Sequence, residues 1–540
     1  MTLWLVLASV VIISCIFFNK LSDKIGLPML FVFILLGMLF GSEGIFKIPF
    51  DNYTFAEEIC SAALIFIIFY GGFGTKWSEA KKVAAKSLLL SSIGVVVTAL
   101  ATGLFCHFVL GFELLESMLI GAVISSTDAA SVFSVLRSKK LNLKYRSASV
   151  LELESGSNDP WAYMLTVIIL SLMKGDVTAS GFVYMLFSQV VYGVAFGVII
   201  ALVSLFILKR MSFETAGFDT IFVLAIAILS YALPSMLGGN GYLSAYIVGI
   251  ILGNANIPNK ANLVHFFDGI TGASQILIFF LLGLLATPSQ MLPIIIPAVA
   301  ILLFLTFIAR PLAVLLTMIP FKSKWRQQVL IAFSGLRGAT SIVFAIMAVV
   351  DDAYTKNDLF HIVFLIVLIS IGVQGTLLPV VAKKLDMIDD KENVMKTFND
   401  YSDETEVQFI RLTINEESGW AGKEIREITL PSGLLVVMII RDGHRIIPDG
   451  KTQILSDDEL VLSAEGFYDD KNFILREFKI TDDHKWCGKP IAEISMPDDG
   501  LIVMIKRDGK TVIPNGQIEI EENDTLVVTS HIKQIRAVKK

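Results

Sequence analysis

The chain has 540 residues, of which 54% are hydrophobic and only 17% are charged, and its formal net charge is −6. A water-soluble globular protein cannot bury so much apolar side-chain area, so the composition predicts that lipid surrounds most of the chain. No basic patch with interleaved aromatic residues is present, so nucleic-acid binding has no support. Charged residues are sparse up to about residue 380 and dense beyond it, which divides the chain into a membrane part and a water-soluble tail.

Thirteen apolar segments are candidates for membrane helices, which need roughly 20 residues each. They lie at 3–18, 27–42, 58–74, 87–108, 115–136, 147–173, 181–208, 218–237, 241–254, 271–287, 290–319, 327–350 and 358–381. The first has no basic residue before it and no cleavage site after it, so we interpret it as a membrane helix and not as a signal peptide.

Lys and Arg are concentrated in alternate loops of this arrangement. If the N-terminus faces outward, the cytosolic loops hold 19 of these residues, whereas the outward loops hold only Lys47, Lys174 and Lys356. Because positive residues stay on the cytosolic side, this bias predicts an odd number of spans and a cytosolic tail.

The fifth segment contains the polar motif SSTDAAS at residues 125–131. Ser, Thr and Asp compete for backbone hydrogen bonds and weaken a helix, so we expect an interruption at mid-membrane depth. Transporters use such interruptions to bind ions. Asp128 is therefore either part of an ion site or the cap of a half-helix that binds no ion.

The sixth segment begins with the motif ESGSNDP at residues 154–160. Ionisable groups within a bilayer are costly, so they usually pair, line a cavity or take part in transport. Helical spacing places Ser155 and Asp159 on one face, with Glu154 and Asn158 on the adjacent row, so two carboxylates are expected to face one region. Asp159 is favoured as the functional group because no cation lies near it in the sequence.

Two arginines are also expected inside the membrane. Arg310 precedes Pro311 in the eleventh segment, and Arg337 lies within SGLRGATS at residues 334–341 of the twelfth. The Gly and Ser residues of this second motif predict another helix break, which would match the first break in an inverted repeat. Glu154 either forms a structural ion pair with one of these arginines or takes part in ion binding.

One carboxylate that is shielded from water is sufficient for an exchange mechanism. Desolvation favours the protonated form of a carboxyl group, whereas a dehydrated K⁺ or Na⁺ needs oxygen ligands, ideally one of them negative. Asp159 can hold a cation or a proton but not both, and a site that opens alternately to the two sides would exchange them. A single exchangeable charge predicts electroneutral, one-for-one exchange without any cofactor or enzymatic step.

At these residues the chain resembles the bacterial NhaP-type antiporters of the monovalent cation:proton antiporter-1 family, especially the K⁺/H⁺ branch with a TrkA-type tail. The matching stretches are IGLPMLFVFILLGMLFG, GSEGIFKIPFDNYTFA, IGAVISSTDAASVFSVL, LELESGSNDP, ARPL and SGLRGAT. The resemblance implies an all-α bundle of thirteen transmembrane helices with inverted repeats and two crossed discontinuous helices. It further implies a homodimer in the lipid bilayer of a bacterial inner membrane.

The resemblance also implies roles for individual residues. Asp159 would bind the exchanged cation or proton, supported by Asp128, Thr127, Ser155 and Asn158. Glu154 would pair with Arg310, and Arg337 would stabilise the crossing of the broken helices. Relatives often carry an acidic residue where Tyr70 stands here. A phenol is neutral at pH 7, so no ligand role is carried over to Tyr70.

The tail contains an internal repeat. After a membrane domain at 1–385 and a linker at 386–405, the segment that begins at Trp420 recurs at Trp486, with an offset of 66 residues. Alternating apolar runs followed by Asp-Gly predict β-hairpins, so we expect two β-rich α+β modules at 406–469 and 470–540. Each resembles the TrkA-C (RCK C-terminal) domain, which implies either a sensor of a nucleotide or cyclic dinucleotide or a dimerisation module without a ligand.

Three alternatives to K⁺/H⁺ exchange remain at this point. A Na⁺/H⁺ antiporter would need the same oxygen ligands. A potassium channel with a regulatory tail would need a carbonyl filter such as TVGYG, which the sequence lacks. An intramembrane aspartyl protease could use Asp128 and Asp159 as a dyad, but their local sequences lack the Gly-Asp setting that we expect for that chemistry.

Overall fold

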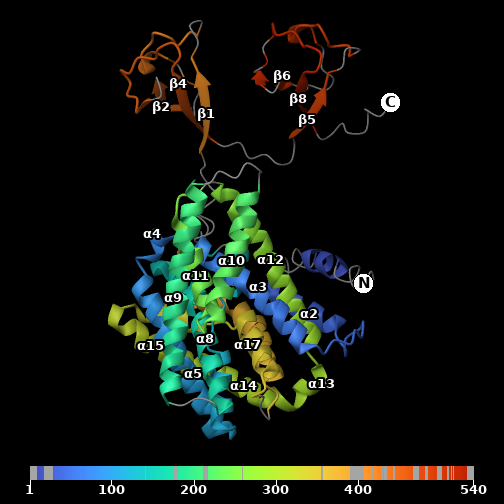
Figure 1. Cartoon of the computed structure of the whole chain (residues 1–540), viewed down its shortest axis with the longest axis vertical. Coiled ribbons are helices and arrows are strands. Elements are labelled where there is room, and N and C mark those ends of the chain that lie inside the picture. Colours follow the sequence, from blue (N-terminus) through green and yellow to red (C-terminus); the bar gives the residue numbers. More distant parts are fainter. Residues whose placement is uncertain are drawn as a thin grey trace. The chain divides into compact units, whose positions relative to one another are not determined.

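The computed structural model divides into two compact units, Met1–Glu404 and Thr405–Lys540 (Figure 1). It describes residues 9–17, 28–139, 141–175, 179–210, 217–257, 259–353 and 357–389 of the first unit. In the second unit it describes residues 407–531, apart from gaps at 415–417, 429, 431–433, 442–443, 466–472, 481–483, 495–501, 508–509, 513 and 515.

The described part of the first unit is built from helices. Residues 9–17 are helical, and the others are α2 (Met29–Phe40), α3 (Tyr53–Gly74), α4 (Trp77–Ala80), α5 (Ala84–Leu110), α6 (Leu114–Val123), α7 (Ala129–Ser138), η1 (Lys144–Arg146), α8 (Ser147–Met173), α9 (Ala179–Arg210), α10 (Phe218–Met236), α11 (Gly241–Asn254), α12 (Lys260–Leu285), α13 (Pro288–Met291), η2 (Leu292–Ile294), α14 (Ile295–Phe304), η3 (Leu305–Ala309), α15 (Arg310–Met318), η4 (Ile319–Phe321), α16 (Trp325–Phe333), α17 (Ala339–Val350), α18 (Leu359–Ile369), η5 (Ser370–Gly375) and α19 (Thr376–Lys384).

These helices agree with the predicted membrane segments. Within the described ranges, seven helical stretches are long and apolar enough to span a bilayer, and α2, α6, α11 and α17 are shorter apolar helices. Each predicted segment from 27–42 onward coincides with a helix or with consecutive helices. The predicted first segment, 3–18, lies partly outside the described residues. The mostly helical, membrane-type fold is therefore confirmed.

Two of the predicted spans are interrupted, as the polar motifs predicted. The backbone leaves the helix between α6 and α7, at residues 124–128, and again between α16 and α17, at residues 334–338. A π-helical turn, η3, also precedes Arg310 and Pro311. Because Pro has no N–H, the turn before it loses a hydrogen bond, and a π-helical turn accommodates that loss. Sequence analysis did not predict this turn.

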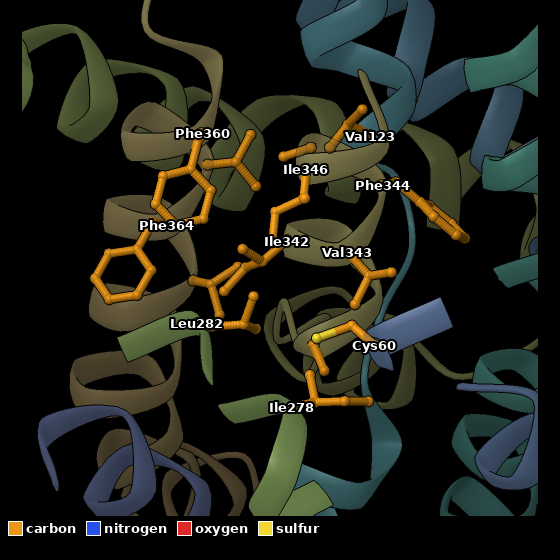
Figure 2. Packing of buried hydrophobic residues seen from close by; sticks show 14 of the residues in the cluster. Cys60, Val123, Ile278, Leu282, Ile342, Val343, Phe344, Ile346, Phe360 and Phe364 are labelled. Carbon is orange, nitrogen blue, oxygen red and sulfur yellow. The ribbon is translucent and has the colours of Figure 1, made fainter. Parts of the chain in front are cut away.

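Helix α17 lies at the centre of the bundle. Figure 2 shows its side chains Ile342, Val343 and Phe344 between residues of neighbouring helices, with Phe360 of α18 and Ile278 of α12 among them. All five of these side chains are at most 1% exposed. A helix that is apolar on every side must be surrounded by other helices, so α17 is a core element, and its first turn is fixed beside the break that precedes it.

The second unit contains two four-stranded antiparallel sheets with the same topology. The strands are β1 (Val407–Thr413), β2 (Leu435–Arg441), β3 (His444–Ile446), β4 (Glu459–Glu465), β5 (Phe473–Lys479), β6 (Ile502–Arg507), β7 (Lys510–Val512) and β8 (Thr525–His531), and short 3₁₀ turns form η7 (Ile425–Glu427) and η8 (Ile491–Glu493). Their order is β1-β4-β2-β3 and β5-β8-β6-β7. The predicted hairpin β2–β3 is confirmed, although its Asp-Gly turn at 442–443 lies outside the described residues.

Each of the two sheets contains the same Arg–Asp pair at equivalent positions of the sequence repeat. Arg441 donates two hydrogen bonds of 2.7 Å to the buried carboxylate of Asp458, and Arg507 makes the same two bonds, of 2.8 Å, with Asp524. The corresponding residues are 66 positions apart. Such a bidentate pair is directional, so it joins the end of β2 or β6 to the turn before β4 or β8.

We predict that Gly283→Ala destabilises the membrane unit, whereas Gly269→Ala on the same helix does not. A Cβ atom at Gly283 would lie 2.2 Å from the carbonyl oxygen of Ile34 on α2, but a Cβ atom at Gly269 would have no neighbour within 4 Å. Overpacking of this kind costs about 1–3 kcal/mol. Thermal unfolding of the two variants in detergent tests this prediction, and equal melting temperatures would contradict it.

We also predict that Arg441→Leu destabilises the first tail sheet by about 1–3 kcal/mol, because Asp458 loses the partner of its buried carboxylate. The hydrogen bonds from Arg441 lower the pKa of Asp458, so the pair stabilises the sheet above the ordinary pKa of about 4 and the stabilisation is lost as pH falls through the lowered value. Amide hydrogen exchange of β4 in the full chain measures the effect.

The matched control is Arg426→Leu, which removes an exposed pair with Glu424 and should change stability by at most about 1 kcal/mol. Equal exchange rates in the two variants would show that the buried pair contributes nothing.

Candidate functional site

Asp159 lies on α8 where both helix breaks approach it, and it lines a cavity of about 850 Å³. Its Oδ1 accepts a hydrogen bond from the hydroxyl of Ser126, in the first break, and its Oδ2 accepts one of 3.1 Å from Thr340, in the first turn of α17. The side chain is only 9% exposed. Two neutral hydroxyl groups from opposite breaks therefore hold this carboxylate within a cavity.

Asp128 caps the second half of the first broken helix. Its Oδ1 accepts a hydrogen bond of 2.9 Å from the backbone of Ala130, and its Oδ2 accepts one of 2.5 Å from the hydroxyl of Ser131. This is the geometry of a helix N-cap. The sequence left open whether Asp128 caps a half-helix or belongs to an ion site. The structure shows that it caps α7, and Asp128 also lines the cavity.

Thr127, Ser155 and Asn158 join the first break to α8. The hydroxyl of Ser155 donates to the carbonyl of Thr127 at 2.8 Å and accepts from the backbone of Ala129 at 2.9 Å. The amide nitrogen of Asn158 donates to Thr127 Oγ1 at 2.8 Å. These bonds satisfy backbone and side-chain groups that the interruption of the helix leaves unpaired, and they fix the position of the break relative to Asp159.

Glu154 faces Arg310 and not the cavity side of α8. The two side chains form an ion pair, and each residue is 1% exposed. The residue pattern left the choice between Arg310 and Arg337 open and the family resemblance implied Arg310; the fold places Arg310 against Glu154. Because both charges are buried, each neutralises the other where water cannot.

Arg337 connects the two breaks. Its Nη1 donates to the carbonyl oxygens of Ser125 at 2.8 Å and Ser126 at 2.6 Å, just beyond the C-terminal end of α6. A cation is favourable at a helix C-terminus because the unpaired carbonyl groups there carry partial negative charge. The backbone N–H of Asp128 also donates to the carbonyl of Leu336 at 2.8 Å, so the two breaks are bonded directly to each other.

The crossing of the breaks requires Gly338. A Cβ atom at this position would lie 2.4 Å from both Cβ and Oδ2 of Asp128, which is closer than real Cβ contacts. The Gly that predicted a helix break is thus also the residue that lets the two breaks approach each other.

The two arginines at the breaks leave two carboxylates, Asp128 and Asp159, without a fixed partner of opposite charge among the described residues. Three carboxylates (Asp128, Glu154 and Asp159) lie beside two guanidinium groups (Arg310 and Arg337). Arg310 pairs with Glu154, and Arg337 binds backbone carbonyls. Asp128 is occupied as the cap of α7, whereas Asp159 receives only hydroxyl donors among the bonds described above, so Asp159 is the group that a proton or a small cation can neutralise.

Four further residues of this region were not predicted from the sequence to belong to the site. Ser126 and Thr340 belong to the two polar motifs, but only the fold shows that their hydroxyl groups meet at Asp159. Glu152 and Asp268 line the same cavity. Tyr70, to which no ligand role was carried over, lines the cavity as well and is 5% exposed, so it faces the same space as Asp159.

Two family models together match most of the chain. Residues 6–384 match the model of the family described as sodium/hydrogen exchanger, transmembrane, and residues 409–466 and 475–540 match the TrkA-C domain. The chain is 36% identical to a K⁺/H⁺ antiporter NhaP of Alkalimonas amylolytica, over 82% of this chain and 78% of that protein. It is 33% identical to a K⁺/H⁺ antiporter NhaP2 of Shewanella baltica, over 83% and 78%.

The fold also matches a solved structure. The sodium proton antiporter MjNhaP1 of Methanocaldococcus jannaschii aligns with a TM-score of 0.63 at 24% identity, over 71% of this chain and 99% of that structure. The family model matches more than half of the chain, and both relatives are more than 30% identical to it over most of its length. This chain therefore belongs to the sodium/hydrogen exchanger family and is a cation/proton antiporter.

Proposed function

We propose that this protein exchanges K⁺ for H⁺ and that Asp159 is the group that binds them in turn. The proposal rests on the carboxylate of Asp159, which lies in a cavity. Two hydroxyl groups donate hydrogen bonds to this carboxylate, and no cation pairs with it among the contacts described. A hydroxyl group can donate a hydrogen bond to a carboxylate, or its oxygen can coordinate a metal ion. The same three side chains can therefore surround either an ion-free carboxylate or a dehydrated monovalent cation.

The choice of K⁺ rests on the relatives. The two most extensive matches described above are named K⁺/H⁺ antiporters and cover more than four fifths of the chain. Na⁺ is the second candidate, because the chain is also 25% identical to a Na⁺/H⁺ antiporter of Aphanothece halophytica over 60% of its length. Higher identity and wider coverage favour K⁺. The channel and protease alternatives are not retained, since the family consists of exchangers.

The other site residues support exchange without being the exchanging group. Four of them hold the first break in place and provide further oxygens near Asp159, namely Asp128, Thr127, Ser155 and Asn158. Glu154 and Arg310 neutralise each other's charge. Arg337 fixes the position of the two breaks. A single exchangeable charge makes the cycle electroneutral, because the site carries the same charge with K⁺ as with H⁺.

We place the protein in a bacterial inner membrane as a homodimer, with its tail in the cytosol. The distribution of Lys and Arg among the loops supports the orientation. We assign 1–385 to the exchanger, 386–405 to a linker, and 406–469 and 470–540 to two regulatory TrkA-C repeats. A nucleotide or cyclic dinucleotide is the class of ligand that we propose for the tail.

We predict that Asp159→Asn abolishes K⁺-dependent proton movement in proteoliposomes, because an amide can neither release a proton nor supply negative charge. Dissipation of an imposed pH gradient after addition of K⁺, Na⁺, Rb⁺ or Li⁺, across a pH series, measures both activity and ion preference. Asp352→Asn, at an exposed position just after the end of α17, is the control and should retain full activity. Exchange that persists in Asp159→Asn would overturn the assignment.

We predict that Glu154→Gln lowers stability by about 3–5 kcal/mol, because Arg310 is left buried without its counter-charge. The double variant Glu154→Gln/Arg310→Met should recover a large part of this loss. Thermal unfolding of the single and double variants gives the coupling energy. If Glu154→Gln lost exchange while keeping its stability, Glu154 would instead be an ion ligand.

A further inference from the structure

Two polar stripes with the same spacing line the cavity, one on α8 and the other on α12. In each stripe an acidic residue is followed by a hydroxyl residue at +3, a Gly at +4 and an Asp or Gln at +7, a spacing that places all four on one helix face. The α8 stripe is Glu152, Ser155, Gly156 and Asp159, and the α12 stripe is Asp268, Thr271, Gly272 and Gln275.

The α12 stripe has no role in the site described above. It lies within Asn262–Leu285, a mostly apolar stretch that also holds His265 and is long enough to span the membrane. A charged group in such a stretch is costly unless it pairs or lines a water-filled cavity. Among the residues that the structure describes, Asp268 has no salt bridge, and the hydroxyl oxygen of Thr271 is buried without a hydrogen-bond partner. Both oxygens are thus available to an occupant of the cavity.

The two stripes also run in the same direction. Helix α8 begins at Ser147 and α12 begins at Lys260, and both starts adjoin loops that the Lys and Arg bias assigns to the cytosol. The rise of an α-helix places Asp159 about 10 Å deeper than Glu152, and Gln275 about 10 Å deeper than Asp268. Two carboxylates therefore stand nearest to the cytosolic loops, and oxygen-bearing side chains continue from them toward the level of Asp159.

We propose that the polar stripe of α12 is one wall of the cytosolic access path of the cation, and that Asp268, which lines the same cavity as the α8 stripe, attracts monovalent cations to it. Negative charge at the mouth of a low-dielectric cavity raises the local concentration of cations. The oxygens of Thr271 and Gln275 replace part of the hydration shell as the ion approaches Asp159. Asp268 thus affects ion capture, whereas Asp159 performs the exchange. This proposal rests on the proposed cation/proton exchange.

The test compares the full-length wild-type protein with Asp268→Asn in proteoliposomes that expose the cytosolic face to the varied K⁺ concentration. At low ionic strength the variant should raise the KM for K⁺ about two- to tenfold and leave kcat unchanged. The difference should shrink at high salt, because exposed charges are screened within about 10 Å at 0.1 M. With K⁺ varied on the opposite face, the two proteins should behave alike.

Two further variants separate capture from structure. Asp268→Glu keeps the charge and should restore the wild-type KM. Thr271→Val keeps the volume and removes the unpaired oxygen, so it should raise KM by an amount that does not depend on salt. A KM in Asp268→Asn that equals the wild-type value, or an increase that is the same at all salt concentrations, would overturn the proposal. Wild-type exchange in the same vesicles tests the proposed function separately.

Discussion

The arrangement depends on one constraint, namely that two membrane helices are interrupted where no bulk water can satisfy the exposed backbone groups. Each unpaired group costs free energy unless a partner is supplied. Arg337 supplies donors to the carbonyl groups beyond α6, and Asp128 accepts from the first N–H groups of α7. Ser155 bonds Thr127 within the break and Ala129 at the start of α7. The first role of the polar residues in the two motifs is therefore to supply hydrogen-bond partners to the backbone groups that the helix breaks expose within the bilayer.

The same constraint isolates Asp159. Once Arg310 is used by Glu154 and Arg337 by the carbonyl groups, neither arginine is left for Asp128 or Asp159. Asp128 caps α7, and Asp159 receives only hydroxyl groups. The negative charge of Asp159 must therefore be neutralised by a proton or cation that binds reversibly. A transporter that exchanges cations for protons needs such a group, so structural compensation elsewhere in the core is what leaves the exchange site available.

The sequence predicted much of the fold, because apolar length, loop charge and helix-weakening residues are local properties. The segments from α2 onward, both breaks, and the hairpin of the tail were predicted in this way, and the family resemblance specified the exchanger fold. The partners of the polar residues were not predictable from local pattern. Whether Glu154 meets Arg310 or Arg337, and whether Thr340 reaches Asp159, depends on how α8, α15 and α17 cross. The π-helical turn before Arg310 escaped prediction because Pro311 alone is compatible with several kinds of helix distortion.

The central claim is that one carboxylate trades a proton for a metal ion, and proton release on K⁺ binding tests it most directly. Calorimetric titration of the purified protein with K⁺, in buffers of different ionisation enthalpy, counts the protons released for each ion bound. The account predicts that one proton leaves for each K⁺ that binds when Asp159 starts protonated, and that Asp159→Asn releases none. Binding of K⁺ without proton release in the wild-type protein, at every pH examined, would contradict it.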